Sequence, residues 1–571
     1  MSAVLGISAF YHDSAAALVI DGEIVAAMQE ERFSRRKFDA TLPSQAARAC
    51  LAQAKLAPDD VDRVVFYEDP FARLERVLLS LLRTFPRSWR QFPKAVGAQV
   101  GSKILVLDRI AKTIGVSRQK VTTVTHHRSH AASAFFASTF DKAAVLTVDG
   151  MGEDISTAIW LGSDRSLSCI GAIEYPHSIG LLYAAITAYL GFEVNDGEYK
   201  VMGLAAFGEP KFKDEFSKLL RLRTDGSFEL DMSFFAFHTD TDILFSHKLE
   251  MLLGTPRSRS KSWDLQSNAD DRRCADIAAS LQWITEEALV SLAKEAQRRT
   301  GCKCLCLAGG VALNCVANAR ILKECGFDRV FVQPAAGDAG GALGAAILGS
   351  IELDGTRPQP MTTAALGTSI SNDATRALAE RLGIKHSIPE DILGCTANLI
   401  AQNKIVGVAR GRFEWGPRAL GNRSILAAPQ DVAMREKMNR AIKKREPFRP
   451  FAPAVIKQEA GIWFTDHDND MTPFMTTIGR VQTDHASELQ AVTHVDGTAR
   501  VQTVDQLHSP DLYELLSEVG RRTGAPIVLN TSLNGNGEPI VASEVDALGF
   551  FISHSIDAMV AGDVLLQRHP S

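Results

Sequence analysis

Residues 143–150 read AAVLTVDG, and residues 155–175 continue as ISTAIWLG-SD-RSLSCIGAIEY, two apolar runs separated by a short polar turn. The N-terminus has the same order, with VLGIS at 4–8 and AAALVI-DG-EIVAA at 15–27. In this N-terminal copy, Asp21-Gly22 supplies the positive backbone angles that a tight hairpin needs. Two copies of strand, polar loop and hairpin, about 140 residues apart, predict a duplicated domain.

Helical segments separate these strands, which makes the chain an α/β protein. Apolar residues recur at helical spacing in SQAARACLAQAKL (44–56) and in ADIAASLQWITEEALVSLAKEAQRR (275–299). Two further strand-to-helix units begin at CLCLAGG (304–310) and at VFVQPAAGDAGG (330–341). Prolines and small polar residues then interrupt the pattern, which predicts a linker at 356–366 between a domain at 1–355 and a second α/β domain at 367–571.

Length and composition indicate an ordinary globular protein of two or more domains. The chain has 571 residues, is 46% hydrophobic and 23% charged, and carries a formal net charge of -5. That charge argues against a nucleic-acid-binding protein, because no overall positive field is present. We find neither a signal peptide nor an apolar run of the ~20 residues that span a bilayer, so we expect a cytoplasmic protein without a membrane segment.

Two histidines four residues apart are candidate metal ligands. On a helix, His126 and His130 would lie on one face with both rings within reach of one ion. Asp149 and Asp338 follow predicted strands, and polar groups converge at the strand ends of an α/β sheet. Such a set suits a divalent transition metal such as iron or zinc. The alternative is surface histidines and turn-forming aspartates, and spacing alone does not separate the two.

Three glycine clusters follow apolar strands: DGMG (149–152), AGG (308–310) and GDAGGALG (337–344). Glycine lets the backbone turn tightly and bring its N–H groups close to a phosphate, where a helix N-terminus adds positive potential. Together the clusters favour a nucleotide site.

The second domain is rich in basic residues between 412 and 449, namely Arg412, Arg418, Arg423, Arg440, Lys443, Lys444, Arg445 and Arg449. A solvated basic face is the alternative for such a run. Here the arginines alternate with aromatic residues, prolines and glycine, which fit a shaped surface better. Because the guanidinium fork binds phosphate oxygens in pairs, the pattern predicts a site for a small phosphate compound. Arg500 and the polar run Asn530-Thr531-Ser532 are candidates to complete it.

Residues 71–98 mix basic and apolar side chains at helical spacing. They predict a helical insertion that packs on its own domain or on a second subunit, or else a helix at a membrane surface.

Motifs along the whole chain resemble the O-carbamoyltransferases of natural-product biosynthesis. They are HDSAAAL (12–18), EERFSRRK (30–37), HHRSHAASAF (126–135), VDGMGE (148–153), GEYKVMGLA (197–205), LAGGVALNCVAN (307–318), GDAGGALGAA (337–346), GRFEWGPRALGNRSI (411–425), REPFRPFAPAV (445–455), HVDGTARVQ (494–502) and NTSLNGNGEPI (530–540). The resemblance is weakest near 70–110 and 210–270.

The resemblance implies a duplicated ASKHA domain (the actin, sugar kinase and Hsp70 class), which binds iron and nucleotide, followed by a YrdC-like α/β domain. It also implies that carbamoyl phosphate and ATP, with Mg²⁺, form a carbamoyl-adenylate, and that the carbamoyl group passes to the hydroxyl of a small-molecule acceptor such as an antibiotic or toxin. The acceptor itself is not implied, and a homodimer is only a general expectation.

Residue by residue, the resemblance implies four groups of site residues. The metal ligands are His126, His130, Asp149 and Asp338, with Fe²⁺ preferred to Zn²⁺. The catalytic pair is His12, as a neutral base for the acceptor, and Lys37, near the adenylate. The nucleotide loops contribute Asp149, Gly150, Gly309, Gly310, Asn314, Gly337, Gly340 and Gly341. The carbamoyl phosphate site contains Arg418, Arg423, Lys443, Arg449, Arg500, Asn530 and Ser532, and Lys444 is an alternative to Lys443.

Other functions fit the sequence less well. A hydrogenase-maturation carbamoyltransferase would add an acylphosphatase domain and C-x-x-C zinc fingers, whereas none of the nine cysteines forms a C-x-x-C pair. A tRNA-modifying transferase would need an RNA-binding surface. A nucleotide-gated binding module would leave the basic second domain without a role.

Overall fold

The first five strands form one sheet in the computed structural model, which describes residues 2–85, 97, 105–240, 242–446 and 448–568. The strands are β1 (Ala3–Ser8), β2 (Ala15–Ile20), β3 (Glu23–Gln29), β4 (Arg63–Phe66) and β5 (Val121–Thr123), in the order β3-β2-β1-β4-β5. β1 to β3 are antiparallel, and β4 and β5 run parallel to β1. The predicted hairpin turns at Asp21 and Gly22, whose φ angles of 47° and 80° suit a tight turn.

The second sheet repeats this arrangement. Its strands are β6 (Lys142–Val148), β7 (Ile155–Ser163), β8 (Ser166–Glu174), β11 (Cys304–Ala308) and β12 (Arg329–Val332), in the order β12-β11-β6-β7-β8. Again the first three are antiparallel and the last two run parallel to the first. The predicted duplication, and with it the ASKHA-like α/β class of this domain, is confirmed.

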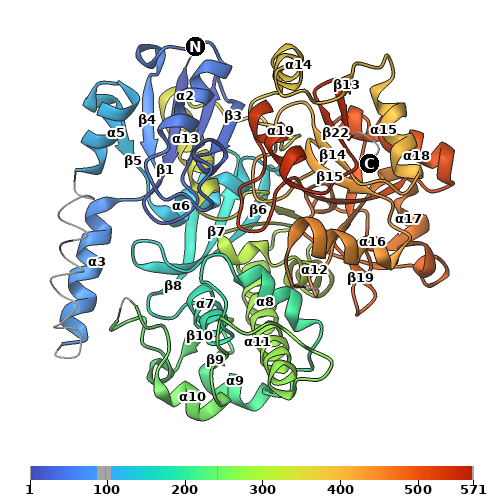
Figure 1. Cartoon of the computed structure of the whole chain (residues 1–571). Helices are drawn as coiled ribbons and strands as arrows, with labels where there is room; N and C mark the ends of the chain where they lie inside the picture. Colours follow the sequence, from blue (N-terminus) through green and yellow to red (C-terminus); the bar gives the residue numbers. More distant parts are fainter. Residues whose placement is uncertain (1, 86–96, 98–104, 241, 447, 569–571) are drawn as a thin grey trace.

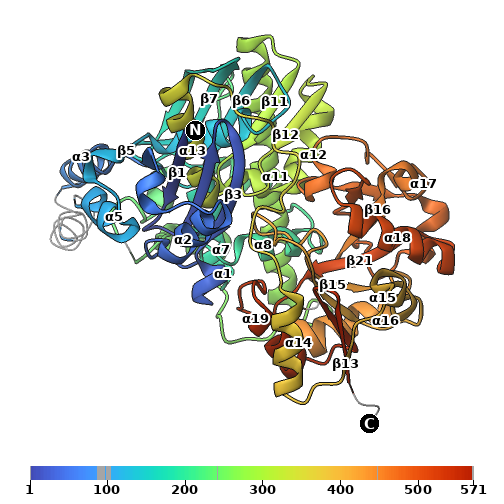
Figure 2. The same cartoon turned by 90° about the horizontal axis from the view of Figure 1, so that it is seen from above.

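Helices α6 (His126–Phe135) and α13 (Asp338–Asp354) pack between the sheets, and α13 lies against β1, β2 and β4 although it follows them by more than half the domain. Figures 1 and 2 both show α13 beside β1. The approach is close, because a side chain at Gly6 would overlap the backbone of Ala342 and one at Gly344 would overlap the backbone of Ser129. The fold thereby brings the starts of α6 and α13 together.

The other described helices of the first domain lie around the two sheets. They are α1 (Glu31–Ser34), α2 (Ser44–Gln53), α5 (Val106–Ile114), α7 (Ile179–Tyr189), α8 (Glu198–Ala205), α9 (Lys213–Leu219), α10 (His247–Leu253), α11 (Ala269–Thr300) and α12 (Cys315–Glu324). A two-stranded hairpin, β9 (Leu220–Leu222) and β10 (Phe228–Leu230), lies between α9 and α10. The long helix α11 packs against α8, α12 and β6.

Helix α3 (Pro70–Arg83) confirms part of the predicted helical insertion. Asp69 caps its N-terminus by accepting hydrogen bonds from the backbone N–H groups of Phe71 and Ala72. Pro70 alone is buried among the residues of this helix, and Figure 1 shows the helix at the edge of the molecule, away from the sheets. The rest of the insertion, 86–96 and 98, lies outside the described residues. In the described parts of the chain, no helix combines the length and apolarity needed to cross a membrane.

The second domain is built on an eight-stranded mixed sheet in the order β13-β23-β22-β14-β15-β21-β16-β20. The strands are β13 (His386–Ser387), β14 (Val406–Ala409), β15 (Arg423–Ala427), β16 (Ala452–Ile456), β20 (Gln502–Val504), β21 (Ile527–Ser532), β22 (Ala558–Ala561) and β23 (Val564–Gln567). Helices α14 (Asn372–Arg381), α15 (Ile392–Ala401), α16 (Val432–Lys437), α18 (Pro510–Thr523) and α19 (Glu544–Ser553) pack around it. A small sheet of β17 (Phe464–Thr465), β18 (Gly479–Val481) and β19 (Thr498–Ala499) is appended.

Residues 356–366 contain neither helix nor strand, as expected of a linker. The segment is nevertheless tied down, because the N–H of Met361 donates to Ala137 O and the N–H of Trp415 donates to Ala364 O. The domain bounds themselves remain a prediction.

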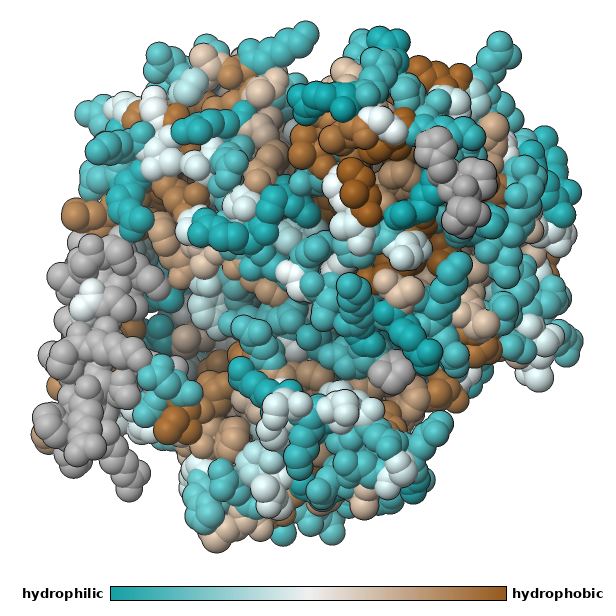
Figure 3. Space-filling model, viewed as in Figure 1, coloured by the Kyte–Doolittle hydropathy of each residue, from teal (hydrophilic) through white to brown (hydrophobic). Residues whose placement is uncertain are grey.

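One face of the second domain is notably apolar. Figure 3 shows hydrophobic residues gathered where α14 and α19 lie in Figure 1. On α19, Val545 and Ile552 are 64% and 55% exposed and stand seven residues apart, on one side of the helix. The predicted homodimer remains a prediction.

Candidate active site

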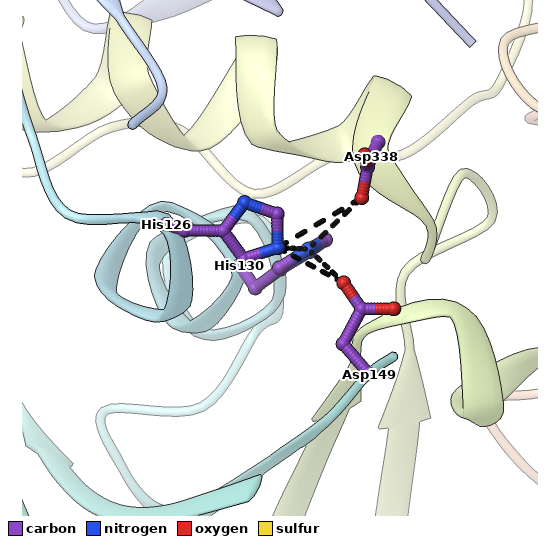
Figure 4. A group of neighbouring side chains, drawn as sticks. All are labelled: His126, His130, Asp149 and Asp338. Atoms are coloured by element: carbon purple, nitrogen blue, oxygen red, sulfur yellow. Dashed lines mark hydrogen bonds and ion pairs between the residues drawn. The ribbon is translucent and has the colours of Figure 1, made fainter. Parts of the chain in front are cut away.

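Four buried side chains from three elements converge at the meeting point of α6, β6 and α13. His126 and His130 lie one turn apart at the start of α6, Asp149 directly follows β6, and Asp338 is the first residue of α13. Figure 4 shows both imidazole rings turned toward the two carboxylates. One ligand atom from each residue lies within 4.8 Å of all the others. The predicted set of metal ligands therefore forms one cluster.

The distances and chemistry within the cluster fit a divalent metal ion. Asp149 Oδ2 is 2.9 Å from His126 Nε2 and 3.2 Å from His130 Nε2, and the two Nε2 atoms are 3.1 Å apart. Asp338 Oδ1 lies 3.8 Å from each Nε2. Within the described residues, neither Nδ1 atom has a hydrogen-bond partner, so each ring has its polar contacts at the cluster. Two neutral nitrogens and two carboxylates suit iron and zinc alike.

The third histidine of the helix has a structural role. His127 Nδ1 contacts Thr147 Oγ1 at 2.8 Å, and its Nε2 contacts Ile155 O at 2.9 Å. Burial, together with the neighbouring His126 and His130, lowers the pKa of His127 to about 3. His127 therefore stays neutral and fastens α6 to the second sheet.

Sequence reasoning missed Glu153, which positions the ligand helix. Its carboxylate accepts the backbone N–H of His126 at 2.9 Å and that of Asp69 at 2.8 Å. The same carboxylate thus holds the first turn of α6 and the residue that caps α3. The available signal was its place in VDGMGE, four residues after a predicted ligand.

A cavity of about 410 Å³ lies between the two domains and reaches the cluster at Asp149. The predicted site residues that line it are His12, Lys37, Asp149, Gly150, Gly310, Asn314, Gly337, Arg418, Lys443, Arg449, Arg500, Asn530 and Ser532. A much smaller cavity on the other side of the cluster is bordered by Tyr11, Glu68, His126 and Asp338. The structure therefore brings most of the predicted nucleotide and phosphate residues to one space.

Three of the predicted nucleotide glycines do not line this cavity. Gly309, with φ 91°, packs against the backbone of Val148 at the end of β6. Gly340 and Gly341 lie inside α13, where side chains would overlap Ala335 O and Tyr67. These glycines allow close packing of the backbone. In the sequence, a glycine needed for packing looks the same as a glycine that binds phosphate. Gly337, by contrast, faces open space.

Asn314 lies at the cavity edge with its amide already hydrogen-bonded. It exchanges two hydrogen bonds with the amide of Gln282, at 2.9 and 3.0 Å, and caps α12 by accepting the N–H of Ala317. Its side chain therefore shapes the loop that precedes α12.

Arg423 differs from the prediction, because the structure places it outside the cavity. Its side chain is fully buried and donates to the carbonyl oxygens of Arg410, Gly411, Asn422, Thr368 and Ala542. A guanidinium that binds five carbonyl groups is a structural tie between loops of the second domain. Arg423 lies only five residues after Arg418 in the same motif, so the sequence does not show that the two side chains have different surroundings.

The cavity wall on the side of the second domain is strongly cationic. Burial and the neighbouring Arg500 lower the pKa of Arg418 to about 9, and burial and Arg449 lower the pKa of Arg445. Among the described residues, the buried Nε atoms of Arg418 and Arg500 have no hydrogen-bond partner. Arg418 and Arg500, which have no carboxylate partner among the described residues, therefore make a site for an anion.

The structure distinguishes Lys443 from Lys444. Lys443 is buried and contacts the side chain of Asn534 at 2.9 Å and that of Ser532 at 3.3 Å, whereas Lys444 is exposed and lines no part of the cavity. Burial and Arg445 hold the pKa of Lys443 well below its ordinary value. Lys443 is therefore the lysine of the cavity.

Two further residues that line the cavity were not among the predicted site residues. Arg445 lines the cavity, and Tyr199 of α8 places its ring 4.7 Å from the guanidinium carbon of Arg449. Arg445 belongs to the basic run, and Tyr199 belongs to the motif GEYKVMGLA. The contact between Tyr199 and Arg449 across the two domains could not be predicted from the sequence.

Comparison with known families decides the family to which the chain belongs. Residues 3–347 match the model of the carbamoyltransferase N-terminus, and residues 397–568 match that of the carbamoyltransferase C-terminus. The chain belongs to the carbamoyltransferase family. The resemblance seen in the sequence motifs is thereby confirmed.

This carbamoyltransferase is similar to two named relatives over most of its length. It is 36% identical to the nodulation protein NolNO of Sinorhizobium fredii, over 98% of this chain and 79% of that protein. It is 31% identical to the 3'-hydroxymethylcephem-O-carbamoyltransferase of Streptomyces clavuligerus, over 79% of this chain and 81% of that enzyme. A solved structure, HypF of T. kodakarensis, is 15% identical over 63% of this chain and 49% of that chain, with a TM-score of 0.32.

The predicted catalytic pair of the carbamoyltransferase lies at the cavity with acidic partners. His12 Nδ1 is 3.2 Å from Asp13 Oδ2, and Lys37 Nζ is 2.6 Å from Asp196 Oδ1. Burial lowers the pKa of His12, but the charges of Asp338 and Asp13 outweigh it and raise the pKa to about 10. The sequence predicts a neutral His12, whereas the neighbouring carboxylates of Asp338, Asp13 and Asp149 favour the protonated imidazole in the structure.

Proposed function

We propose that this carbamoyltransferase converts carbamoyl phosphate and ATP, supplied with Mg²⁺, into a carbamoyl-adenylate, and transfers the carbamoyl group to a hydroxyl of a small-molecule acceptor. The observation that carries the proposal is the cavity shared by both domains, which has a cationic wall from the second domain, and glycine loops and the edge of a metal-type cluster from the first. The name of the cephem relative supports an oxygen acceptor. We further propose that the metal is iron and that the enzyme works in the cytoplasm.

The cationic wall would bind the donor. Carbamoyl phosphate carries its charge on phosphate oxygens, and Arg418 and Arg500 offer guanidinium groups that no carboxylate neutralises among the described residues. Loss of inorganic phosphate with the uptake of water gives carbamate. A carbamate oxygen then bonds to the α-phosphorus of ATP, and pyrophosphate leaves.

The glycine loops would bind the nucleotide. Gly150, Gly310 and Gly337 line the cavity beside the cluster, and a side chain at Gly337 would meet open space. The N–H of Gly310 donates to Asp149 Oδ1 at 3.1 Å, which fixes this loop against the metal-type cluster. Lys37, three residues after the end of α1, lines the same cavity and is placed to approach the adenylate phosphate.

His126, His130, Asp149 and Asp338 would hold a divalent cation, which would polarise the carbamoyl oxygen and balance the carboxylate charge that raises the pKa of His12. His12 Nε2 then takes the proton of the acceptor hydroxyl, since its Nδ1 faces Asp13. The hydroxyl oxygen bonds to the carbamoyl carbon, and the bond from that carbon to the phosphate oxygen of AMP breaks.

The test does not require knowledge of the acceptor. The purified protein is incubated with ATP, carbamoyl phosphate and labelled pyrophosphate, and the return of label to ATP is measured. Label that appears only with carbamoyl phosphate supports the adenylate step. No exchange, although both substrates are shown to bind, would contradict the proposed donor chemistry or show that the acceptor must bind first, and repetition with candidate hydroxyl acceptors separates these outcomes.

A further inference from the structure

The loop at 534–540 forms part of the cavity wall where the two domains meet. All seven residues, NGNGEPI, line the cavity, and those at 536–538 are also exposed to solvent. On the side of the second domain, the loop is held by Lys443, whose Nζ contacts Asn534 Oδ1 at 2.9 Å, and by the Nδ2 of Asn536, which donates to Lys444 O at 3.2 Å. The loop thus lies between the cavity and bulk water at this edge.

Arg35 holds this loop from the first domain. Its two terminal nitrogens donate to Ile540 O at 2.8 Å and to Pro539 O at 2.9 Å, and its Nε lies 3.2 Å from Asp546 Oδ1. Within the described residues, these are the hydrogen bonds that the first domain gives to the loop. The planar guanidinium therefore fixes the loop in direction as well as in distance.

Further contacts hold both ends of this contact in place. Asp546 also accepts from the N–H and the hydroxyl of Ser543, which caps α19. Arg35 ends α1 in the left-handed backbone conformation, with φ 57°. Two residues later, Lys37 lines the cavity and pairs with Asp196. The segment from Arg35 to Lys37 therefore connects the loop of the second domain with the first half of the first domain, to which the segment belongs. Through Asp196, it also connects the loop with the second half of that domain.

The contact matters because of what the cavity would contain. A carbamoyl-adenylate is a mixed anhydride, and water that reaches its carbamoyl carbon breaks the bond to the phosphate oxygen, which gives carbamate and AMP. The intermediate must therefore be kept from solvent between its formation and its transfer.

We propose that Arg35 is a positioning residue that keeps the wall at 534–540 closed over the carbamoyl-adenylate and so prevents its hydrolysis. This inference rests on the proposed function. Arg35 lines no part of the cavity and touches no substrate position, so it acts through the loop.

The neighbouring Arg36 provides a matched control. It is the same residue type in the same segment, its side chain is 68% exposed, and its side-chain partner is Asp39 at 3.1 Å. Arg35→Ala and Arg36→Ala are compared with the wild type in the presence of ATP and carbamoyl phosphate, without acceptor. Two rates are measured: carbamoyl-phosphate-dependent exchange of pyrophosphate with ATP, and release of AMP.

The expected result is a change in the ratio of the two rates. In Arg35→Ala, exchange should stay within about twofold of the wild type, whereas AMP release should rise roughly tenfold, the effect expected when a closed state loses about one charge-assisted hydrogen bond. Arg36→Ala should match the wild type in both rates. Arg35→Lys, which keeps a cation for Asp546 but not the paired carbonyl contacts, should show an intermediate release of AMP and provides the test if the alanine variant does not fold.

An equal ratio of AMP release to exchange in the Arg35 variants and in Arg36→Ala would overturn this inference, because the wall would then be closed without Arg35. Absence of exchange in the wild type, with and without acceptors, would overturn the proposed function itself. The two failures are thus distinguishable.

Discussion

Replacement of Arg418 by methionine should weaken donor binding and stabilise the fold at the same time. Arg418 lies in a cationic wall where burial and Arg500 lower its pKa to about 9, so the folded protein without an anion bears a cost for keeping it charged. Methionine has a similar length and no charge, so it should fill the same space without the repulsion.

The two effects differ in sign and in size. A guanidinium that binds a phosphate through two charge-assisted hydrogen bonds contributes about 3–6 kcal/mol, so its loss should reduce kcat/KM for carbamoyl phosphate roughly 10²–10⁴-fold. Removal of a poorly compensated buried charge should in turn stabilise the unliganded protein by about 1–3 kcal/mol.

Donor use is measured by the pyrophosphate exchange described above, over a range of carbamoyl phosphate concentrations. Stability is measured as the midpoint of thermal unfolding, because a chain of two domains need not unfold in one step. Inorganic phosphate should raise the midpoint of the wild type, since it binds the folded form, and should raise that of the variant less. A variant with an unchanged KM and a lowered midpoint would show that Arg418 is a structural residue.

Three further experiments test the remaining assignments. Arg423→Lys should destabilise the second domain by about 2–4 kcal/mol, because lysine cannot replace the hydrogen bonds to five carbonyl groups. The KM for carbamoyl phosphate should stay unchanged in this variant. A KM that is raised as in the Arg418 variant would show that Arg423 belongs to the donor site. His130→Ala should lower the metal content measured by elemental analysis, whereas His127→Gln should retain it; equal metal in both variants would show that the ligand set is wrong. Because burial holds the pKa of Lys443 well below 10.5, the folded protein binds fewer protons than the unfolded chain between these two pKa values, so its stability rises with pH there. The advantage in unfolding midpoint of Lys443→Met over the wild type should therefore be largest at low pH and shrink toward about pH 10, and an advantage that is the same at every pH would contradict the lowered pKa.

The duplicated architecture could be predicted because each hairpin follows from a local pattern. Asp21-Gly22 fixes a hairpin through its own backbone angles, and the repeat at 143–175 carries the same alternation of runs and turns. The position of α13 could not be predicted, because no residue pattern within 338–354 indicates which of the two sheets the helix covers. That depends on close packing between Gly6 and Ala342, two residues far apart in the chain.

The candidate site was predictable to the level of segments and less so to the level of side chains. Arg418 and Arg423 belong to one short motif, yet one faces the cavity and the other binds carbonyl groups, because strand β15 begins at Arg423 and turns its side chain inward. Similarly, Gly337 precedes α13 and is open, whereas Gly340 is inside the helix. Residue type and spacing are alike in these pairs, and only tertiary packing separates them.

The late position of α13 has a consequence for synthesis on the ribosome. The first sheet is complete in sequence at Thr123, but the helix that covers it ends at Asp354, about 230 residues later. At a synthesis rate of about 5–20 residues per second, the apolar face of that sheet stays without this helix for roughly 10–50 s. During this interval the nascent chain offers a surface for chaperones or for aggregation, and chains that terminate between β5 and α13 should be insoluble.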